Sequence, residues 1–218
     1  MNRLDLSGQD QERKGEIRSD LAKDEDIALM ERVKAGDSEA FNLLMKKYEK
    51  TVVNLVFRFT GDRESAEDLA QEVFLRVYRA AGRFEARAKF FTYLYKVTLN
   101  LCRNARAKAQ RRRTNSLDAP RPGYEDQPLK RELEDPAGSA EDHLARQELA
   151  EVVREAVMDL PEEQRVAVIL QRYQGLAYEE IADTLGLSIP AVKSRLHRAK
   201  LNLRKKLEPY LENEEITA

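Results

Sequence analysis

Apolar residues recur along most of this chain at intervals of three and four, the spacing of α-helices that bury one face. The run 52–59 is β-branched and aromatic and alone would favour a strand, but the helical period continues through it. Glycine is scarce, and Leu, Ala, Glu, Lys and Arg dominate the composition. These are helix-forming residues, so the sequence predicts an all-α protein.

Punctuating residues divide the first part of the pattern into four helices. A short helix stops before Gly36, and Asp37 and Asp62 are placed to cap the second and third, because a carboxylate accepts hydrogen bonds from free backbone N–H groups. A loop over 84–89 leads into the fourth helix. Its apolar residues follow at spacings of four, three and four: Phe90, Leu94, Val97 and Leu101. We expect one four-helix domain over 24–113.

Two further segments lack helical periodicity. Residues 1–23 are polar, of mixed charge and without the apolar stretch of a secretion signal, which predicts a disordered N-terminal extension. Residues 114–142 contain four prolines and eight acids, the composition of a flexible acidic linker. A second small helical domain is expected over 143–211, followed by a tail at 212–218.

The second domain contains a strong helix-turn-helix pattern. A short helix from Tyr178 is followed by a tight turn at Gly186, and Ser188 can cap the next helix. That helix turns its apolar residues inward at spacings of three and four. Its outward, hydrogen-bonding and cationic face lies in the first half, where a recognition helix meets base edges: Lys193, Ser194, His197 and Arg198, with Arg195 beside them. A solvated helix in an ordinary bundle is the weaker alternative.

The predicted helix 63–81 has two contrasting faces. We expect its core stripe to contain Ala66, Leu69, Ala70, Val73, Phe74, Val77 and Tyr78. A leucine lies among polar residues on the opposite face, as in a small binding patch: Asp68, Gln71, Glu72, Leu75 and Arg79. Taken alone, this face is better explained as a solvated surface.

The segment 84–100 interleaves aromatic rings with cations. Rings can stack on unpaired bases while cations hold the backbone. The candidate residues are Phe84, Arg87, Lys89, Phe91, Tyr93, Lys96, Asn100 and Arg103. The alternative is that the rings pack in the core and only the charges are exposed, and this segment alone does not decide between them.

Charge and catalytic signals narrow the class of function. The formal net charge is −1, yet ten Lys and Arg stand against one acid in 83–113, and seven against none in 184–207. Two local cationic clusters are typical of a protein that contacts nucleic acid in two places. Two histidines far apart and one cysteine, Cys102, provide no metal site, and we expect no cofactor and no enzymatic activity. The single cysteine also favours a reducing cytoplasm.

Taken together, these stretches resemble a bacterial sigma factor of the extracytoplasmic-function group. Residues 68–79 are similar to the helix that docks on the clamp helices of RNA polymerase. Residues 84–100 are similar to the segment that melts promoters and recognises the −10 element, and 160–207 to the domain that recognises the −35 element. All three occur in the order expected for the family.

The resemblance implies a non-enzymatic subunit that gives core RNA polymerase its promoter specificity. Partners would be core polymerase, promoter DNA and an anti-sigma factor, with no membrane insertion. Phe84, Asn100 and the loop between Phe84 and Phe90 would hold an extruded base of the −10 strand. Two departures stand out: Tyr93 occupies a position where the family commonly has Trp, and Ala177 occupies one where a Ser or Thr cap is common.

Two other classes of protein are weighed against this interpretation. A stand-alone helix-turn-helix regulator with an N-terminal helical sensor domain would share the C-terminal half. It would not explain the polar face of 63–81 or the aromatic-basic segment. A structural adaptor would not need two cationic modules.

Overall fold

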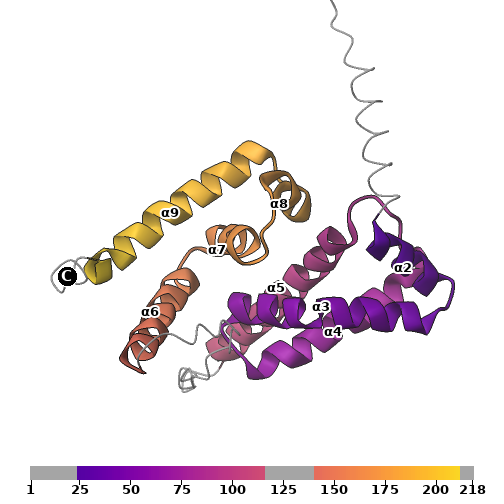
Figure 1. Ribbon diagram of the computed structural model, residues 1–218, viewed down its shortest axis with the longest axis horizontal. Helices are drawn as coiled ribbons and strands as arrows, with labels where there is room; N and C mark the ends of the chain where they lie inside the picture. The colour runs from indigo at the N-terminus through magenta and orange to yellow at the C-terminus, as the bar shows by residue number, and fades with distance from the viewer. Residues whose placement is uncertain (1–23, 116–139, 212–218) are drawn as a thin grey trace, which may run out of the picture.

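The computed structural model describes residues 24–115 and 140–211, and every regular element within them is helical (Figure 1). The all-α prediction is therefore confirmed for the described residues. The extension 1–23, the tail 212–218 and most of the expected linker lie outside them. The structure extends helices into both ends of the expected linker, since α5 ends at Asn115 and α6 begins at Ala140.

Helices α2 to α5 form one group, here called the first unit. They are α2 (Glu25–Lys34), α3 (Ser38–Thr60), α4 (Glu64–Ala80) and α5 (Phe90–Asn115), with a 3₁₀ turn η1 (Ala81–Arg83) after α4. Helix α3 includes the 52–59 run, so the helical interpretation of that run is confirmed. Its left-handed C-terminal residue, Gly61, has φ of 76°, a conformation that glycine adopts without steric cost.

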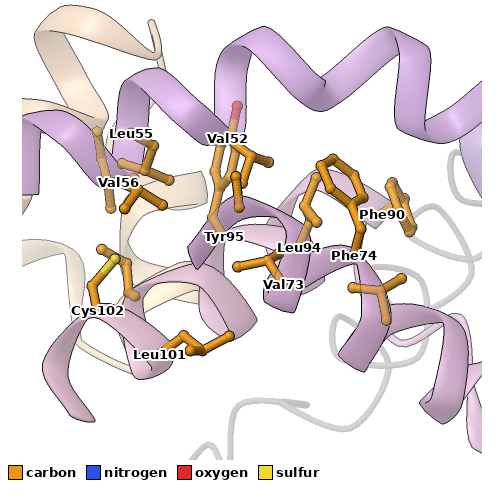
Figure 2. Close-up of a cluster of buried hydrophobic side chains, with 14 of the residues drawn as sticks. Val52, Leu55, Val56, Val73, Phe74, Phe90, Leu94, Tyr95, Leu101 and Cys102 are labelled. Atoms are coloured by element: carbon orange, nitrogen blue, oxygen red, sulfur yellow. The ribbon is translucent and has the colours of Figure 1, made fainter. Parts of the chain in front are cut away.

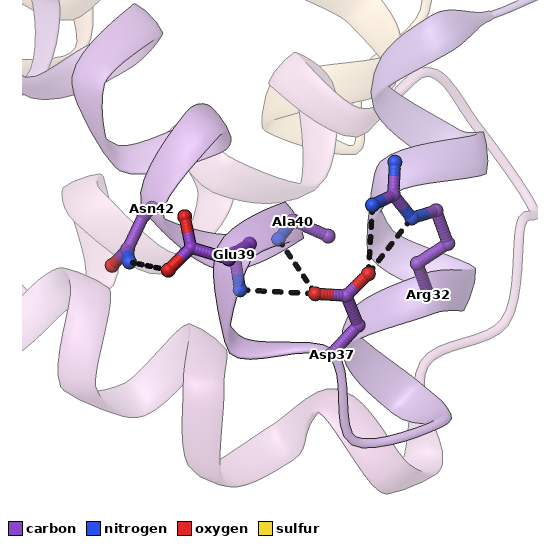
Figure 3. A network of polar contacts seen from close by, with 5 residues as sticks. All are labelled: Arg32, Asp37, Glu39, Ala40 and Asn42. Carbon is purple, nitrogen blue, oxygen red and sulfur yellow. Dashed lines mark hydrogen bonds and ion pairs between the residues drawn. The ribbon is translucent and has the colours of Figure 1, made fainter.

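Asp37 caps α3 and ties it to the preceding helix (Figure 3). Its carboxylate accepts hydrogen bonds from the backbone N–H groups of Glu39 (3.0 Å) and Ala40 (3.2 Å). The guanidinium of Arg32 on α2 donates to the other carboxylate oxygen at 2.7 and 3.0 Å. The Arg32 side chain and the capped backbone together lower the pKa of Asp37. One carboxylate thus fixes the turn between α2 and α3.

Apolar side chains from α3, α4 and α5 meet in the core of the first unit (Figure 2). Val52, Leu55, Phe90 and Leu94 are almost completely buried in it. A buried carboxylate, Asp26, lies at its edge and accepts hydrogen bonds from Lys47 Nζ and the Tyr48 hydroxyl, each at 2.6 Å. Burial, and then the hydrogen bond to Asp26, raise the pKa of Tyr48. These two contacts supply hydrogen-bond donors to the buried Asp26 carboxylate.

The remaining helices form a second group, the second unit. They are α6 (Ala140–Met158), α7 (Glu162–Val168), α8 (Tyr178–Leu185) and α9 (Ile189–Leu211). Helix α7 continues into a π-helical turn, η2 (Ile169–Tyr173), in which the Gln174 N–H donates to the Ile169 carbonyl at 3.2 Å. A π turn carries one extra residue per turn and so changes the direction of the side chains around it.

The two units lie against each other in this structure (Figure 1). Helix α8 contacts α5, and the π turn η2 contacts α3. Buried apolar residues of both units, among them Val56 and Cys102 from the first and Ile169 and Ile181 from the second, belong to one continuous hydrophobic cluster. Within the described residues, no helix is long and apolar enough to span a bilayer.

Candidate functional site

Helices α8 and α9 form the expected helix-turn-helix. Gly186 ends α8 in the left-handed conformation, with φ of 66°, and the Ser188 hydroxyl accepts from the Ala191 N–H at 3.4 Å at the start of α9. Ile181 and Val192 are fully buried where the two helices meet. The tight turn and this apolar contact fix the direction in which α9 presents its outer face.

The predicted recognition residues lie together on that outer face. Lys193, Ser194, His197 and Arg198 are exposed, while Arg195 is partly covered and pairs with Glu163 at 3.1 Å. The Arg198 guanidinium donates to the Ser194 hydroxyl at 3.2 Å. The Lys193 ammonium lies 5.8 Å from the centre of the Tyr178 ring. Neighbouring side chains therefore restrain all three of these cations before any ligand arrives.

A capping contact at the start of α8 compensates for Ala177, which sequence reasoning left unexplained. Alanine has no side-chain acceptor, so the N-cap itself contributes nothing. The Glu180 carboxylate instead accepts from the Ala177 backbone N–H at 3.0 Å, which is the reciprocal half of a capping box. The Glu at the third helical position, visible in the sequence, is the signal that could have predicted this contact.

The polar face of α4 is exposed as predicted. Asp68, Gln71, Leu75 and Arg79 are exposed, with 48% of Leu75 open to solvent, and Glu72 is half-buried in an ion pair with Arg76 at 2.8 Å.

One assignment on α4 is wrong. Tyr78 was placed in the core stripe, but 49% of it is exposed and its ring packs against Phe41, 4.9 Å away between centroids. Tyr78 follows Leu75 by three residues, so the two side chains are neighbours on the surface of α4. The apolar part of this face is therefore larger than the sequence indicated.

The aromatic-basic segment places its rings and its charges differently. Phe84 is only 5% exposed and packs against Tyr93 (5.5 Å) and Phe90 (6.5 Å). Its carbonyl accepts from Lys34 Nζ at 3.0 Å, which holds the loop against α2. Phe91 and Tyr93 are half-buried, and burial raises the pKa of Tyr93.

The polar members of the segment face solvent. Arg87, Lys89, Lys96, Asn100 and Arg103 are all exposed. Arg87 pairs with Glu85 at 2.5 Å, and the Lys89 ammonium lies 5.5 Å from the centre of the Phe91 ring. In this structure Phe84 is thus a packing residue, whereas Phe91 and Tyr93 are only half-buried and the polar members of the segment are exposed.

Three contacts between the units were not foreseen from the sequence. Lys89 Nζ donates to Glu180 at 3.0 Å, and Arg103 Nε donates to Glu162 at 3.2 Å. The Tyr95 hydroxyl donates to the Gln174 side-chain oxygen at 3.1 Å. Burial, and then the charge of Glu180, raise the pKa of Tyr95 to about 12.

Two observations on the described residues concern nucleophilic and metal-ligating side chains. Cys102 is buried, and burial raises the pKa of its thiol to about 12, so the nucleophilic thiolate is disfavoured. Among the described residues, no three His, Cys, Asp or Glu side chains gather as metal ligands would.

Comparison with known proteins assigns both units to a family. The model of sigma-70 region 2 matches residues 44–112, and the model of sigma-70 region 4 matches 150–203. The RNA polymerase sigma-H factor of Pseudomonas aeruginosa is 36% identical over 88% of this chain and 98% of the relative. The ECF RNA polymerase sigma-E factor of Escherichia coli strain K12 is 34% identical over 85% of this chain and 96% of the relative.

Solved structures share the fold. CnrH, solved in complex with the cytosolic domain of CnrY, superposes with a TM-score of 0.60 at 22% identity, covering 84% of this chain and 96% of that chain. The sigma factor RpoE of Bartonella quintana, solved with the anti-sigma factor NepR, gives 0.62 at 21% identity, covering 77% and 96%.

Proposed function

This chain belongs to the extracytoplasmic-function group of RNA polymerase sigma factors, and from that membership we propose a division of labour among its three surfaces. The α4 face binds core RNA polymerase, the exposed side of 87–103 binds the −10 strand, and the outer face of α9 recognises the −35 element. The observation that carries the proposal is the exposed polar face of α9, which is the second helix of a well-formed helix-turn-helix.

The α9 face suits a duplex major groove. Lys193 and Arg198 can donate to guanine acceptors or phosphates, and Ser194 and His197 add shorter hydrogen-bonding groups. Ser194 holds the Arg198 guanidinium, which lowers the conformational entropy that the side chain loses on binding. A cation placed in advance contributes to base discrimination as well as to affinity.

The α4 face suits a protein partner. Leu75 and Tyr78 supply exposed apolar area, and the surrounding carboxylates and amide supply a polar rim. An apolar centre enclosed by polar residues is the usual anatomy of a protein–protein contact. We assign Asp68, Gln71, Glu72, Leu75 and Arg79 to the core-polymerase contact, with Tyr78 added from the structure.

The 87–103 surface suits a melted strand. Phe91 and Tyr93 offer partly exposed rings, and the cations Arg87, Lys89, Lys96 and Arg103 track a backbone beside Asn100. Each base stacked on a ring contributes about 1–3 kcal/mol, comparable to the cost of opening one base step. A surface that binds unpaired bases therefore favours the open promoter, because it binds only that state.

The proposal extends to organisation and partners. We assign 24–113 to the polymerase and −10 domain, 114–142 to the acidic linker, and 143–211 to the −35 domain. The protein acts in the cytoplasm beside its polymerase and has no enzymatic activity of its own. An anti-sigma factor is a further partner, which the complexes of CnrH and of the Bartonella sigma factor support by analogy.

Co-elution with sigma-free bacterial core RNA polymerase on size exclusion tests the proposal. The wild-type chain is expected to form a stoichiometric complex, and Leu75→Arg to lose it, because the new charge lies at the centre of the apolar patch. Leu149→Arg, on α6, is the matched control, since Leu149 is also an exposed leucine. A folded wild-type chain that does not bind core polymerase would contradict the proposal.

A further inference from the structure

The loop that joins η1 to α5 is fixed at both of its ends. Phe84 and Phe90 border it, and only 5% of the first and 1% of the second are exposed. Between them, residues 85–87 and Lys89 are open to solvent. The loop thus has an exposed middle between two buried rings, and the positions of those rings set where its backbone lies.

At the first end of the loop, three groups of Phe84 have a partner. Its ring packs against Phe90 and Tyr93, and its N–H donates to the Ala81 carbonyl at 3.0 Å. Its carbonyl accepts from Lys34 Nζ, also at 3.0 Å, and this partner lies 50 residues earlier in the chain. The ring and the N–H are held by residues close in the sequence, so it is Lys34 that ties this end of the loop to α2.

The Phe84 carbonyl is the closer of two acceptors around the Lys34 ammonium. The Glu31 carboxylate lies 3.8 Å from Nζ, which is long for an ion pair, and both side chains are partly exposed. An exposed pair of this kind contributes little, whereas the hydrogen bond to the carbonyl is shorter and charge-assisted. The ammonium is therefore held mainly by the loop and not by its own helix.

At the second end of the loop, α2 acts through a tyrosine. The Tyr48 hydroxyl of α3 donates to the buried Asp26 carboxylate of α2 at 2.6 Å. The Tyr48 ring packs against Phe90, with 5.5 Å between ring centroids. Helix α2 therefore supports each end of the loop, once directly and once through Tyr48.

We infer that Lys34 is a positioning residue for recognition of the −10 strand: it holds the Phe84 carbonyl, and so keeps the backbone of 85–89 in the conformation that receives an unpaired base. The inference rests on the proposed function of the 87–103 surface, and it adds α2 to the elements that determine base preference there. A loop already in its binding conformation loses less entropy on binding. A base that fits that conformation gains from this, and a base that does not fit gains little.

Two simpler roles for Lys34 predict different results. As a phosphate contact it would add similar affinity to every strand, since phosphates carry no sequence information. As a cation in the last turn of α2 it would stabilise the helix through the dipole, which Arg32 in the same turn does as well. A positioning role differs from both, because loss of the bond lowers base preference.

Lys34→Met is the test variant, because methionine has a similar length and cannot donate to the Phe84 carbonyl. Lys34→Arg restores a cationic donor. Lys50→Met is the charge control, since it removes an exposed lysine of α3. Arg32→Met is the stability control, because it removes the other cation of the last turn of α2 together with its ion pair to Asp37.

Two quantities are measured for each full-length protein. Hydrogen exchange followed by mass spectrometry gives the deuterium uptake of the loop 84–89. Fluorescence anisotropy gives the affinity of the holoenzyme, against core polymerase alone as background, for labelled 12-nucleotide strands of dA, dC and dT. Base preference is the ratio of the weakest to the tightest dissociation constant among the three strands.

In Lys34→Met we expect faster exchange in the loop and weaker binding of the preferred strand. If about a third to a tenth of the loops keep the competent conformation, the dissociation constant of that strand rises about three- to tenfold. The weakest strand should change little, so the ratio falls. Lys34→Arg should restore the ratio, and both controls should keep the wild-type value.

Three results would overturn the inference alone: unchanged exchange in the loop of Lys34→Met, equal weakening of all three strands, or the same loss of preference in Arg32→Met. A wild-type holoenzyme that shows no preference among the strands would instead overturn the proposed function of the 87–103 surface, and this inference with it. The two failures are therefore distinguishable in one experiment.

Discussion

Single side chains of this sigma factor are positioned by neighbours on the same or the next helix. Ser194 holds Arg198, Tyr178 lies beneath Lys193, and Glu163 holds Arg195. Of these three supports, Ser194 lies among the recognition residues themselves. A residue at this surface can therefore act on DNA directly or through the cation that it orients.

Arg198→Ala tests the direct role. We expect initiation from a promoter with an intact −35 element to weaken, with about 1–3 kcal/mol of discrimination lost at one base pair if the arginine makes a bidentate contact. Binding to core polymerase should not change. In vitro transcription with −35 point variants measures the effect. Lys205→Ala, an exposed cation nearer the end of α9, is the control and should weaken all promoters alike.

Asp37→Asn separates charge from capping at the α2–α3 turn. Asparagine still caps α3 but cannot pair with Arg32 as an anion. The folded-state pKa of Asp37 is lowered, so its ionic contribution is present above the unfolded value near 3.8 and is lost as pH falls through the folded value. The urea midpoint of the variant should lie below that of wild type at pH 6, and the two should converge below pH 3.8. A difference independent of pH would contradict the ionic role.

At the scale of the element, local signals predicted most of the helices. Gly36 and Gly61 end helices, and Asp37 and Ser188 begin them, because positive φ and side-chain acceptors are properties of single residues. The π turn at 169–173 has no such signal, since its sequence continues the apolar pattern of α7. Tyr78 was misplaced for a related reason. Helical spacing assigns a residue to one face of the helix, but it does not show how much of that face the neighbouring helices cover.

Ala177→Ser should complete the capping box of α8. The N-cap has extended backbone, with φ of −66° and ψ of 161°, and its residue is exposed, so a serine hydroxyl can accept from the N–H of Glu180 without strain. We expect the second unit to gain about 0.5–2 kcal/mol of unfolding free energy. Thermal unfolding followed by circular dichroism measures it, with Ala177→Val as the control that lacks an acceptor. An unchanged midpoint would mean that Glu180 already satisfies this end of the helix.

At the scale of the whole molecule, the sequence predicted the surfaces but not their relation. It indicated where cations gather in 87–103 and which face of α9 points outward, because both depend on local spacing. It contained no signal that Glu162 would meet Arg103, 59 residues away, or that Glu180 would meet Lys89, 91 residues away. Pairing over that distance depends on tertiary packing, and exposed Glu and Lys residues are compatible with many partners.

Arg165 is a buried cation of the second unit that lies over the Phe59 ring of the first. It is 1% exposed, its guanidinium donates to the Met158 carbonyl at 2.9 Å, and its Nε lacks a hydrogen-bond partner within the described residues. Burial of this cation has a desolvation cost, which the Phe59 ring and the Met158 carbonyl act against.

Arg165→Met tests whether burial of this charge lowers the stability of the protein. Methionine fills a similar volume without a charge, and replacing buried charges with apolar side chains is often neutral or stabilising by about 1–4 kcal/mol. We expect unchanged or higher unfolding free energy in urea. Arg172→Met, which removes an exposed cation from the π turn, is the matched control. A lower unfolding free energy would show that the Phe59 and Met158 contacts of Arg165 outweigh the cost of burying its charge.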